Sequence, residues 1–330
     1  MNSESFSRGS SSATGAVSAI NSSTLVSASH DEGINDGTLE VHPQAPHSAT
    51  VWKLNYQEAH IYALPLPSIF QASMTDILHV SDTHLGLRQY RSNVRRSDFA
   101  DAFDTAVDIA IDEDVDAVVH TGDLFDDPSP NVPTVNRCLD AVSRLESEDI
   151  PFLAIVGNHE RKRDEQWMDI VKRFGNTVRL SASPTLVAEK GGGNPVNVFG
   201  FDAVRNPAWD SYDFSLEEPE DEDAVNLLCM HELFEPLVPP HRGDPYHLDE
   251  FLDRLNFLPD GLALGDFHST CNTEVNGVKA FYPGATERTK VSESSAPCVY
   301  VLEISDGDIQ LRTRTIESAG RDNVPRDFLV

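Results

Sequence analysis

Apolar runs of strand length alternate with amphipathic stretches from residue 77 onward. The runs that have the length of one buried strand are 77–80, 115–120, 152–156, 225–230 and 262–265. Between the first three runs, apolar residues recur at helical spacing over 97–112 and 133–149, with Ser97 as the expected cap of the first helix. Strands that alternate with helices in this way predict an α/β domain.

The second half of the chain has shorter apolar segments, separated by Pro and Gly. We expect strands at 178–180, 185–188 and 196–201, which suggest a second sheet. A closing hairpin is expected from 298–304 and 309–316, because a turn signal separates these two segments.

Residues 1 to about 48 lack apolar periodicity and are rich in Ser, Ala, Gly, Thr and Asn. Such a segment cannot repay the entropy of ordering, so we expect disorder there. Residues 51–73 are more apolar but contain two prolines, and are expected to pack loosely. The predicted organisation is an N-terminal extension (1–73), a folded domain (74–316) and a C-terminal tail (317–330). Met74 is an alternative start, which leaves open whether the extension belongs to the native protein.

The charge balance is far from that of an ordinary globular protein. The 330 residues include 54 Asp and Glu against 25 Lys and Arg, which gives a formal net charge of -29. Because the acidic residues are spread through periodic segments, we interpret them as the surface of a folded domain rather than as a disordered tail. Such a surface suits molar salt, where the Debye length shrinks to about 3 Å. We therefore expect a halophilic source.

The cysteines and the hydropathy favour a cytoplasmic protein. The four cysteines lie far apart and have no CxxC spacing, as is usual in a reducing compartment. No window offers the roughly 18 consecutive apolar residues that a membrane span needs. The N-terminus also lacks the pattern of a secretory signal. We expect no membrane association.

Five of the apolar runs end in a polar cluster. In chain order these clusters are Asp82-Thr83-His84, Gly122-Asp123, Gly157-Asn158-His159-Glu160, His231 and Gly265-Asp266-Phe267-His268. Loops at the carboxyl ends of strands converge in an α/β sheet, so these side chains are expected to form one site. Imidazole and oxygen donors without thiolate favour Mn, Fe or Zn with a bridging carboxylate. We expect the glycines in three of the clusters to let the loops turn sharply.

The same segments resemble the calcineurin-like metallophosphoesterase superfamily. The motifs that carry the resemblance are DTHLG (82–86), GDLFD (122–126), GNHE (157–160), the histidine after LLCM (227–230), and GxxH (265–268) followed by YPGATER (282–288). Within the superfamily the chain is most similar to the SbcD-type double-strand-break repair nucleases. The resemblance covers residues 75 to 316. It implies a four-layer α-β-β-α sandwich of two mixed sheets flanked by helices, with a dinuclear metal centre at the sheet edges.

The resemblance also implies a set of ligands for two divalent metal ions, with Mn as the first choice and Mg, Fe or Zn as alternatives. By position, one ion takes Asp82, His84 and His268, the other takes Asn158, His231 and Asp266, and Asp123 bridges them. A bridging carboxylate holds two ions about 3.5 to 4 Å apart, where they activate water for attack on phosphorus.

Three further residues gain roles from the same motifs. His159 is adjacent to a ligand and is expected to protonate the leaving oxygen or to stabilise its charge. Asp126 is expected to orient a ligand rather than to bind metal. Glu160 has two open interpretations, a residue that positions substrate or a carboxylate at a helix start.

The chain departs from the family at Asp266. The family usually has GHxH where this chain has Gly265-Asp266-Phe267-His268, so a carboxylate replaces an imidazole ligand. The carboxylate can still bind Mn or Mg and would favour hard cations. Alternatively it is too short to reach, which would leave one metal and a weak site.

Basic residues are few but follow the metal-bearing motifs. Arg88 is one of four arginines after DTHLG, Arg161 begins a basic run after GNHE, and Arg288 ends YPGATER. We expect them to form a local positive rim for substrate, with solvated helix-start residues as the alternative. The first function hypothesis is a Mn-dependent DNA exo/endonuclease of repair type, with DNA as its partner.

Two other hypotheses stay open. The chain can be a phosphoesterase acting on nucleotides or other small phosphoesters, or a non-catalytic metal-binding subunit of a repair or ATPase complex. Few residues follow Arg288, so we expect the DNA-holding capping domain to be reduced or absent. The candidate protein partners are a coiled-coil ABC-type ATPase subunit and a second copy of the chain as a homodimer.

Overall fold

The structure is a computed structural model that divides into two compact units, Met1–Gln71 and Ala72–Val330. It describes residues 74–187, 194–204, 206–219, 221, 223–290, 293 and 296–316, together with the backbone of four strands between residues 24 and 65. The tail expected at 317–330 and the rest of the extension expected at 1–73 lie outside these residues. The domain limits therefore stay a prediction.

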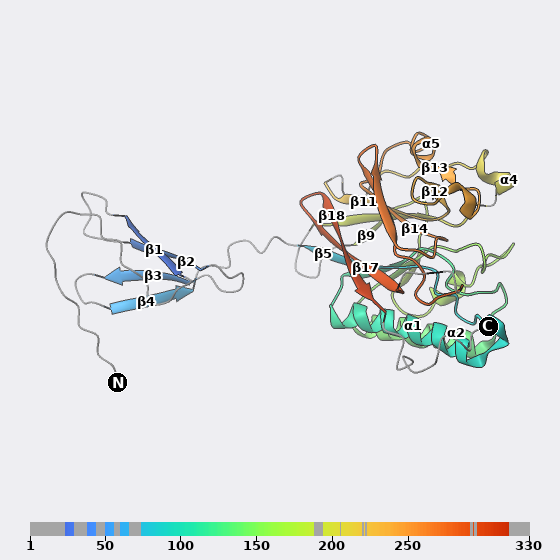
Figure 1. The fold of residues 1–330 in the computed structure, drawn as a ribbon, viewed down its shortest axis with the longest axis horizontal. Helices are drawn as coiled ribbons and strands as arrows, with labels where there is room; N and C mark the ends of the chain where they lie inside the picture. Colours follow the sequence, from blue (N-terminus) through green and yellow to red (C-terminus); the bar gives the residue numbers. More distant parts are fainter. Residues whose placement is uncertain are drawn as a thin grey trace. The chain divides into compact units, whose positions relative to one another are not determined.

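The described part of the N-terminal unit is one antiparallel sheet (Figure 1). Its strands, in sheet order, are β1 (Thr24–Ser29), β2 (Thr38–Pro43), β3 (Thr50–Asn55) and β4 (His60–Pro65). Two of them lie within residues 1–48, where we expected no ordered element. β1 and β2 pair along their whole length. Their pairing uses backbone hydrogen bonds, which do not need the apolar periodicity on which the expectation rested.

One six-stranded sheet of the second unit carries the first three polar clusters. Its strands, in sheet order, are β18 (Asp308–Thr315), β17 (Cys298–Ser305), β5 (Thr75–Val80), β6 (Ala117–His120), β7 (Phe152–Ala154) and β8 (Thr177–Arg179). β5 to β8 are parallel. β17 and β18 form the predicted closing hairpin, and β17 runs antiparallel to β5.

The other six-stranded sheet carries His231 and the 265–268 cluster. Its strands, in sheet order, are β15 (Cys271–Val275), β16 (Val278–Tyr282), β14 (Gly261–Gly265), β11 (Val225–His231), β10 (Val196–Phe201) and β9 (Thr185–Val187). β10, β11, β14 and β16 are parallel, and the two edge strands are antiparallel. Beside this sheet, β12 (Phe234–Glu235) pairs with β13 (Tyr246–His247).

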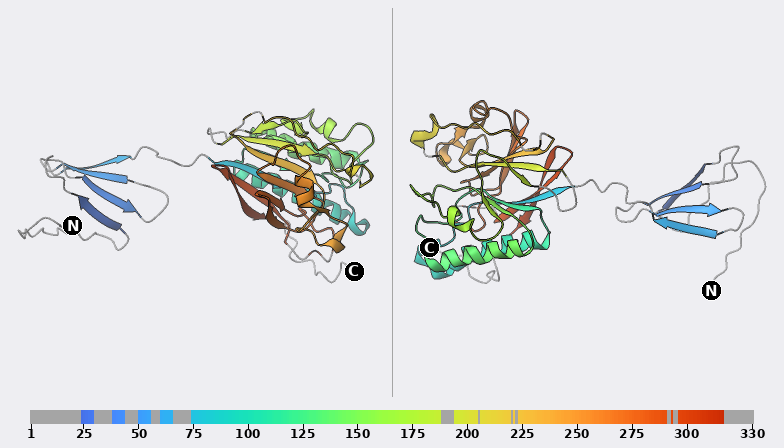
Figure 2. Two further views of the ribbon diagram at one scale, coloured as in Figure 1. Left: turned by 90° about the horizontal axis from the view of Figure 1, so that it is seen from above. Right: turned by 180° about the vertical axis from the view of Figure 1, so that it is seen from behind.

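Helices cover the outer faces of the two sheets (Figure 1 and Figure 2). The helices are η1 (Gln89–Arg91), α1 (Asn93–Asp112), α2 (Val132–Ser147), α3 (Met168–Val171), α4 (Asn206–Trp209), η2 (Pro240–Arg242) and α5 (Leu248–Leu252). α1 and α2 pack on the sheet that contains β5, while short α4 and α5 cover the other sheet. The predicted four-layer sandwich is confirmed. No helix in the described part of the chain is long and apolar enough to cross a membrane.

Three apolar clusters fill the spaces between the layers. Ile77 of β5 faces the other sheet and packs with Val198 and Leu227. The next residue, Leu78, points the opposite way and packs with Phe103 of α1. Successive residues of a strand alternate between faces, and both faces here are covered. This is why the strands read as continuous apolar runs.

The start of α1 differs from the sequence expectation. We expected Ser97 to cap this helix, but Ser92 is the cap and its hydroxyl accepts the backbone N–H of Arg95 at 3.3 Å. The apolar stripe that includes Phe99 and Phe103 is buried as expected. The extra turn is polar, so the apolar pattern did not reveal it.

Candidate metal centre

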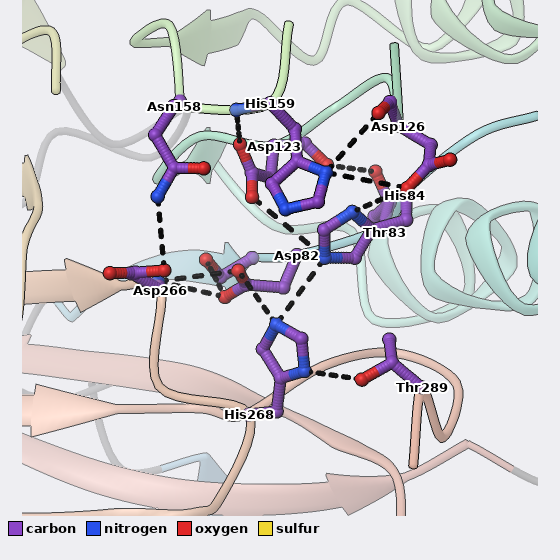
Figure 3. Close-up of polar contacts among 12 residues, drawn as sticks. Asp82, Thr83, His84, Asp123, Asp126, Asn158, His159, Asp266, His268 and Thr289 are labelled. Atoms are coloured by element: carbon purple, nitrogen blue, oxygen red, sulfur yellow. Dashed lines mark hydrogen bonds and ion pairs between the residues drawn. The ribbon is translucent and has the colours of Figure 1, made fainter. Parts of the chain in front are cut away.

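Polar side chains from five strand ends converge where the two sheets meet, and Figure 3 labels those that follow β5, β6, β7 and β14. Their loops follow β5, β6, β7, β11 and β14, because parallel strands of one sheet end at the same edge. Hydrogen bonds tie the sheets together at this edge. The backbone N–H of Asp266 donates to both carboxylate oxygens of Asp82 at 3.2 Å. His231 Nδ1 lies 2.7 Å from the carbonyl oxygen of Thr121 and donates to it.

The first cluster of metal-ligating atoms consists of Asp82, His84 and His268. His84 Nε2 lies 3.3 Å from His268 Nε2, which in turn lies 3.5 Å from Asp82 Oδ1 (Figure 3). Two imidazole nitrogens at this distance must share a proton or face a common cation, because two lone pairs repel each other. These are the three residues that the resemblance assigned to one ion.

The second cluster consists of Asp82, Asp123 and His231. His231 Nε2 lies 3.3 Å from Asp123 Oδ2 and 3.9 Å from Asp266 Oδ1. The amide nitrogen of Asn158 donates to the same Asp266 oxygen at 3.2 Å. The structure therefore brings together all the residues expected at the second ion, and their roles as ligands stay a prediction.

Two carboxylates lie between the clusters. Asp123 Oδ2 is 3.3 Å from His231 Nε2 and 3.8 Å from His84 Nε2. Asp82 belongs to both clusters. The resemblance gave the bridging role to Asp123 alone, whereas the geometry allows either carboxylate to bridge.

Buried polar atoms without a hydrogen-bond partner test whether the donor set fits a cation. Within the described residues, they include Asp123 Oδ2 and His231 Nε2, and also His84 Nδ1, which lies on the outer side of its ring toward Asp126. Nearly all buried polar atoms in native proteins have a partner. The first two of these atoms face each other across the second cluster, and both are good metal donors. The donor set therefore fits divalent metal ions.

The charged residues of the two clusters shift one another's pKa values. Burial acts to raise the pKa of Asp82, but the hydrogen bond with His268 and the charges of neighbouring histidines lower it below its usual range. Burial acts to lower the pKa of His268, but Asp82 and Glu293 raise it to about 10. Burial likewise opposes the charge on His231, but Asp123 raises its pKa well above the usual value. Protons on these imidazoles thus balance the carboxylates when no cation is bound.

Four of the expected ligands have a left-handed backbone. The φ angles are 52° at Asp82, 43° at His84, 55° at Asp123 and 78° at Asp266. This conformation costs a residue with a side chain about 1 kcal/mol or more, and it persists where surrounding contacts enforce it. The concentration of such residues at the converging loops supports a functional site.

Gly157 and Gly265 provide space for the ligands. A Cβ atom on Gly157 would overlap Asp123, and one on Gly265 would lie 2.5 Å from Ser81 Oγ and 2.6 Å from His231 Nδ1. Of the three motif glycines, only Gly122 has a left-handed φ, of 95°. The reason for glycine at 157 and 265 is therefore close approach rather than the sharp turn that we expected.

His159 lies at the open side of the first cluster. Its side chain is 48% exposed, and its ring centroid is 4.8 Å from that of His84. Nδ1 of His159 lies 3.2 Å from the backbone oxygen of Asp126 and 3.4 Å from its carboxylate. The hydrogen bond to Asp126 raises the pKa of His159 to about 9, so the ring carries a proton near neutral pH.

Asp126 contacts two histidines at once. Besides His159, its carboxylate lies 3.5 Å from Nδ1 of His84. A carboxylate on the outer nitrogen of a ligand histidine fixes the orientation of the ring. The position of Asp126 agrees with the orienting role that the motif implied.

Glu160 has a position that neither interpretation anticipated. Its side chain is buried and accepts the backbone N–H groups of Phe125 at 2.7 Å and Gly157 at 3.1 Å. Burial raises its pKa to about 7. The next helix, α3, begins only at Met168. Glu160 thus joins two ligand-bearing loops instead of facing substrate or starting a helix.

The three arginines singled out in the sequence lie in different places. Arg161 lines a cavity of about 270 Å³ together with Asn158, His231 and Asp266. Arg288 lies near His268 in a smaller pocket. Arg88 is exposed and donates to the carbonyl oxygen of a neighbouring arginine rather than facing the cluster. Only Arg161 shares a cavity with expected ligands of the second ion.

Two residues at the site were missed in the sequence. Nδ1 of His268 lies 2.7 Å from Thr289 Oγ1 (Figure 3) and 3.1 Å from Glu293 Oε1. Thr289 directly follows the YPGATER motif and Glu293 lies five residues after its end, so the motif was the available signal. No spacing rule predicts that this loop returns to His268.

The sequence profile of the calcineurin-like phosphoesterase family matches residues 75–269, which include every expected ligand. The chain belongs to this family. The phosphoesterase family therefore accounts for the order of the motifs and for the donor set described above.

Three proteins similar to this chain are named DNA double-strand break repair protein Mre11. The protein of Methanosarcina acetivorans is 39% identical over 73% of this chain and 38% of its own length. The protein of Haloferax volcanii is 40% identical over 74% of this chain and 53% of its own length. The protein of Halobacterium salinarum is 38% identical over 67% of this chain and 54% of its own length.

This chain therefore spans about two fifths to one half of the length of the relatives that it matches. The similarity agrees with the resemblance to double-strand-break repair nucleases within the phosphoesterase family. Two of the relatives come from halophiles, which supports the halophilic source expected from the net charge of -29.

Proposed function

We propose that this chain is a metal-dependent phosphodiesterase that hydrolyses DNA, with Mn²⁺ as its working ion. The observation that carries the proposal is the pair of donor clusters that share Asp82, with the protonated His159 beside them. The names of the relatives support DNA as the substrate. Carboxylate-rich sites with imidazoles suit Mn²⁺, and the carboxylate of Asp266 favours a hard cation.

Divalent ions held by the two clusters would supply Lewis-acid stabilisation of the phosphoryl oxygens and an acidified water. His159 then donates a proton to the leaving oxygen, a step that is typically worth about 10²- to 10⁴-fold in rate. Asp126 holds the imidazolium in place through the contact to Nδ1. His159 must be protonated for this step, so hydrolysis should fall as the pH rises past about 9.

Arg161 is the best candidate for contact with a phosphate of the substrate. Its Nη1 atom is buried and has no hydrogen-bond partner within the described residues. It lines the cavity beside Asn158 and Asp266. An unpaired guanidinium nitrogen next to a metal centre is suited to a phosphate oxygen. The strongly acidic chain repels DNA at long range. One phosphate contact can therefore hold DNA only where salt screens this repulsion.

The decisive experiment is cleavage of end-labelled linear DNA with Mn²⁺ in molar KCl. The wild type is compared with His159→Ala and with a control, His241→Ala, which removes an exposed histidine of η2. We expect His159→Ala to lose about 10²- to 10⁴-fold in rate without loss of bound Mn²⁺. Equal rates for wild type and His159→Ala would refute the role of this residue. Absence of cleavage by the wild type would refute DNA as the substrate.

The same preparation separates the other hypotheses. The second candidate substrate is a small phosphoester, which the cavity of about 270 Å³ and the strongly acidic chain support. Faster turnover of bis(p-nitrophenyl) phosphate than of DNA would select it. Metal binding without Asp82-dependent turnover would select a non-catalytic subunit. An ABC-type ATPase partner and a homodimer remain predictions.

A further inference from the structure

The His268 ring has a defined environment on each of its two nitrogens. Nε2 faces Asp82 and His84 in the first cluster. Nδ1 points away from the cluster toward Thr289 Oγ1 at 2.7 Å (Figure 3) and toward Glu293 Oε1 at 3.1 Å. The two nitrogens therefore contact two different groups of residues.

The hydrogen bonds around Glu293 determine which nitrogen of His268 keeps its proton when the ring is neutral. The hydroxyl of Thr289 lies 2.7 Å from Glu293 Oε1, and the backbone N–H of Thr289 donates to Oε2 at 2.8 Å. An ionised carboxylate only accepts, so the Thr289 hydroxyl is the donor in their contact. Nδ1 must then be the donor toward both partners. In the neutral ring this leaves the Nε2 lone pair free to bind a cation.

The loop that carries Thr289 is fastened to the start of α1. Arg95 donates to Glu287 Oε1 at 3.1 Å and to the carbonyl oxygen of Arg288 at 2.7 Å. Gln89 donates its amide to the carbonyl oxygen of Thr289. The segment that holds His268 is thus attached to the residues that follow Asp82 and His84 in the chain, so one frame supports all three members of the first cluster.

We propose that Thr289 and Glu293 are positioning residues for His268, and that they set the affinity of the first cluster for a divalent ion. The inference rests on the proposed function because it requires a metal at that cluster. A carboxylate on the outer nitrogen of a ligand histidine orients the ring and makes it a stronger ligand. The second cluster does not include His268, so the effect is confined to one of two ions.

The test is calorimetric titration of the metal-free full chain with Mn²⁺ in molar KCl. We compare the wild type, Glu293→Ala, Thr289→Val and the control Glu274→Ala, which removes an exposed carboxylate from β15. Glu293→Ala is expected to lower the affinity for one of the two ions by about 10- to 100-fold. Thr289→Val is expected to lower the affinity for the same ion by a smaller factor. Thr289→Ser keeps the hydroxyl and is expected to bind this ion with the affinity of the wild type.

Several outcomes would overturn the proposal. Wild-type affinity for both ions in Glu293→Ala would refute it while leaving the proposed function intact. Equal weakening of both ions would also refute it, because a general loosening of the domain acts on both clusters. If the wild type binds no divalent ion, the metal centre and this inference fail together. Thermal unfolding of each metal-free variant identifies any that does not fold, and Thr289→Val then carries the test in place of Glu293→Ala.

Discussion

The two halves of the metal centre are built differently. In the first half, the side chains of His84 and His268 are only 2% and 18% exposed, and each ring has a carboxylate near its outer nitrogen. In the second half, Asn158 is exposed, and Asp266 is 27% exposed and lines the cavity with Arg161. The first half thus has a carboxylate behind each histidine, whereas two expected ligands of the second half, Asn158 and Asp266, line the cavity beside Arg161.

The electrostatics of the halves differ in the same way. The Asp82 carboxylate is flanked by histidines that lower its pKa. Burial raises the pKa of Asp266, and the carboxylates Asp82 and Asp123 add to this effect against the charge of His231. A bound cation stabilises the ionised form of a carboxylate most strongly where ionisation is otherwise unfavourable. We therefore expect binding of the second ion to depend on Asp266, where the family usually has histidine.

The largest expected effect comes from a change that damages both halves. Asp82→Asn removes the carboxylate that belongs to both clusters, and we expect loss of both ions. Metal ions contribute several kcal/mol to phosphoryl transfer, so turnover should fall by about 10³-fold or more. Metal content after dialysis and hydrolysis of bis(p-nitrophenyl) phosphate measure the two losses. A variant that retains one tightly bound ion would show that Asp123 alone joins the halves.

A smaller effect is expected when only the open half is changed. Asp266→Asn should lower the affinity for the second ion by about 10- to 100-fold. The affinity for the first ion should stay unchanged, because His268 and His84 keep their partners. Asp244→Asn serves as the control, since Asp244 lines the same cavity and is not in either cluster. Calorimetry with Mn²⁺ gives both affinities.

The reverse change at the same residue tests whether the carboxylate is adapted. Asp266→His restores the side chain that the family usually has. Higher metal occupancy and turnover than in the wild type would indicate a compromised second half. Lower values would indicate that the carboxylate is suited to the native ion.

The pH dependence of metal binding provides a finer distinction. The pKa of His268 is about 10 in the metal-free protein, so the ring is protonated at pH 7 and an ion must displace that proton. Apparent affinity should therefore rise with pH, by up to about tenfold per unit for each proton released. Calorimetry in two buffers of different ionisation enthalpy counts these protons. Binding at pH 7 without proton release would mean that the imidazoles are neutral before the metal binds.

The smallest effect is expected at the other end of β5, far along the strand from Asp82. Burial and Glu303 raise the pKa of Asp76 to about 6, against an ordinary value of 3.8. A raised carboxyl pKa means that the folded state binds the proton more tightly, so stability falls as the pH rises from about 4 to about 6. Asp76→Asn should raise the melting temperature slightly at pH 8 and leave it unchanged at pH 4. A lower melting temperature at pH 8 would contradict this.

Much of the fold could be predicted from local patterns. The apolar run at 77–80 became β5, and the stripe that includes Phe103 became the buried face of α1, because burial on one or both faces imposes its period on the sequence. The polar first turn of α1 and the strands β1 and β2 were missed. Their formation depends on capping and backbone pairing, which leave no apolar pattern.

The motifs at the strand ends could be identified without a structure, and with them the types of donor and their order. Each motif is a local signal, because a ligand must directly follow its strand to reach the sheet edge. The substitution of a carboxylate at Asp266 and the excess of acidic residues could also be read without a structure.

How these donors meet depends on the packing of the two sheets and could not be predicted from the motifs. The tertiary structure brought Asp82 into both clusters, joined two loops through the buried Glu160, and returned Thr289 and Glu293 to the outer nitrogen of His268. Such contacts depend on how two sheets pack and where their loops cross. Residues separated by many positions carry no local pattern for a contact of this kind, because it is specified by the whole packed core rather than by any one segment.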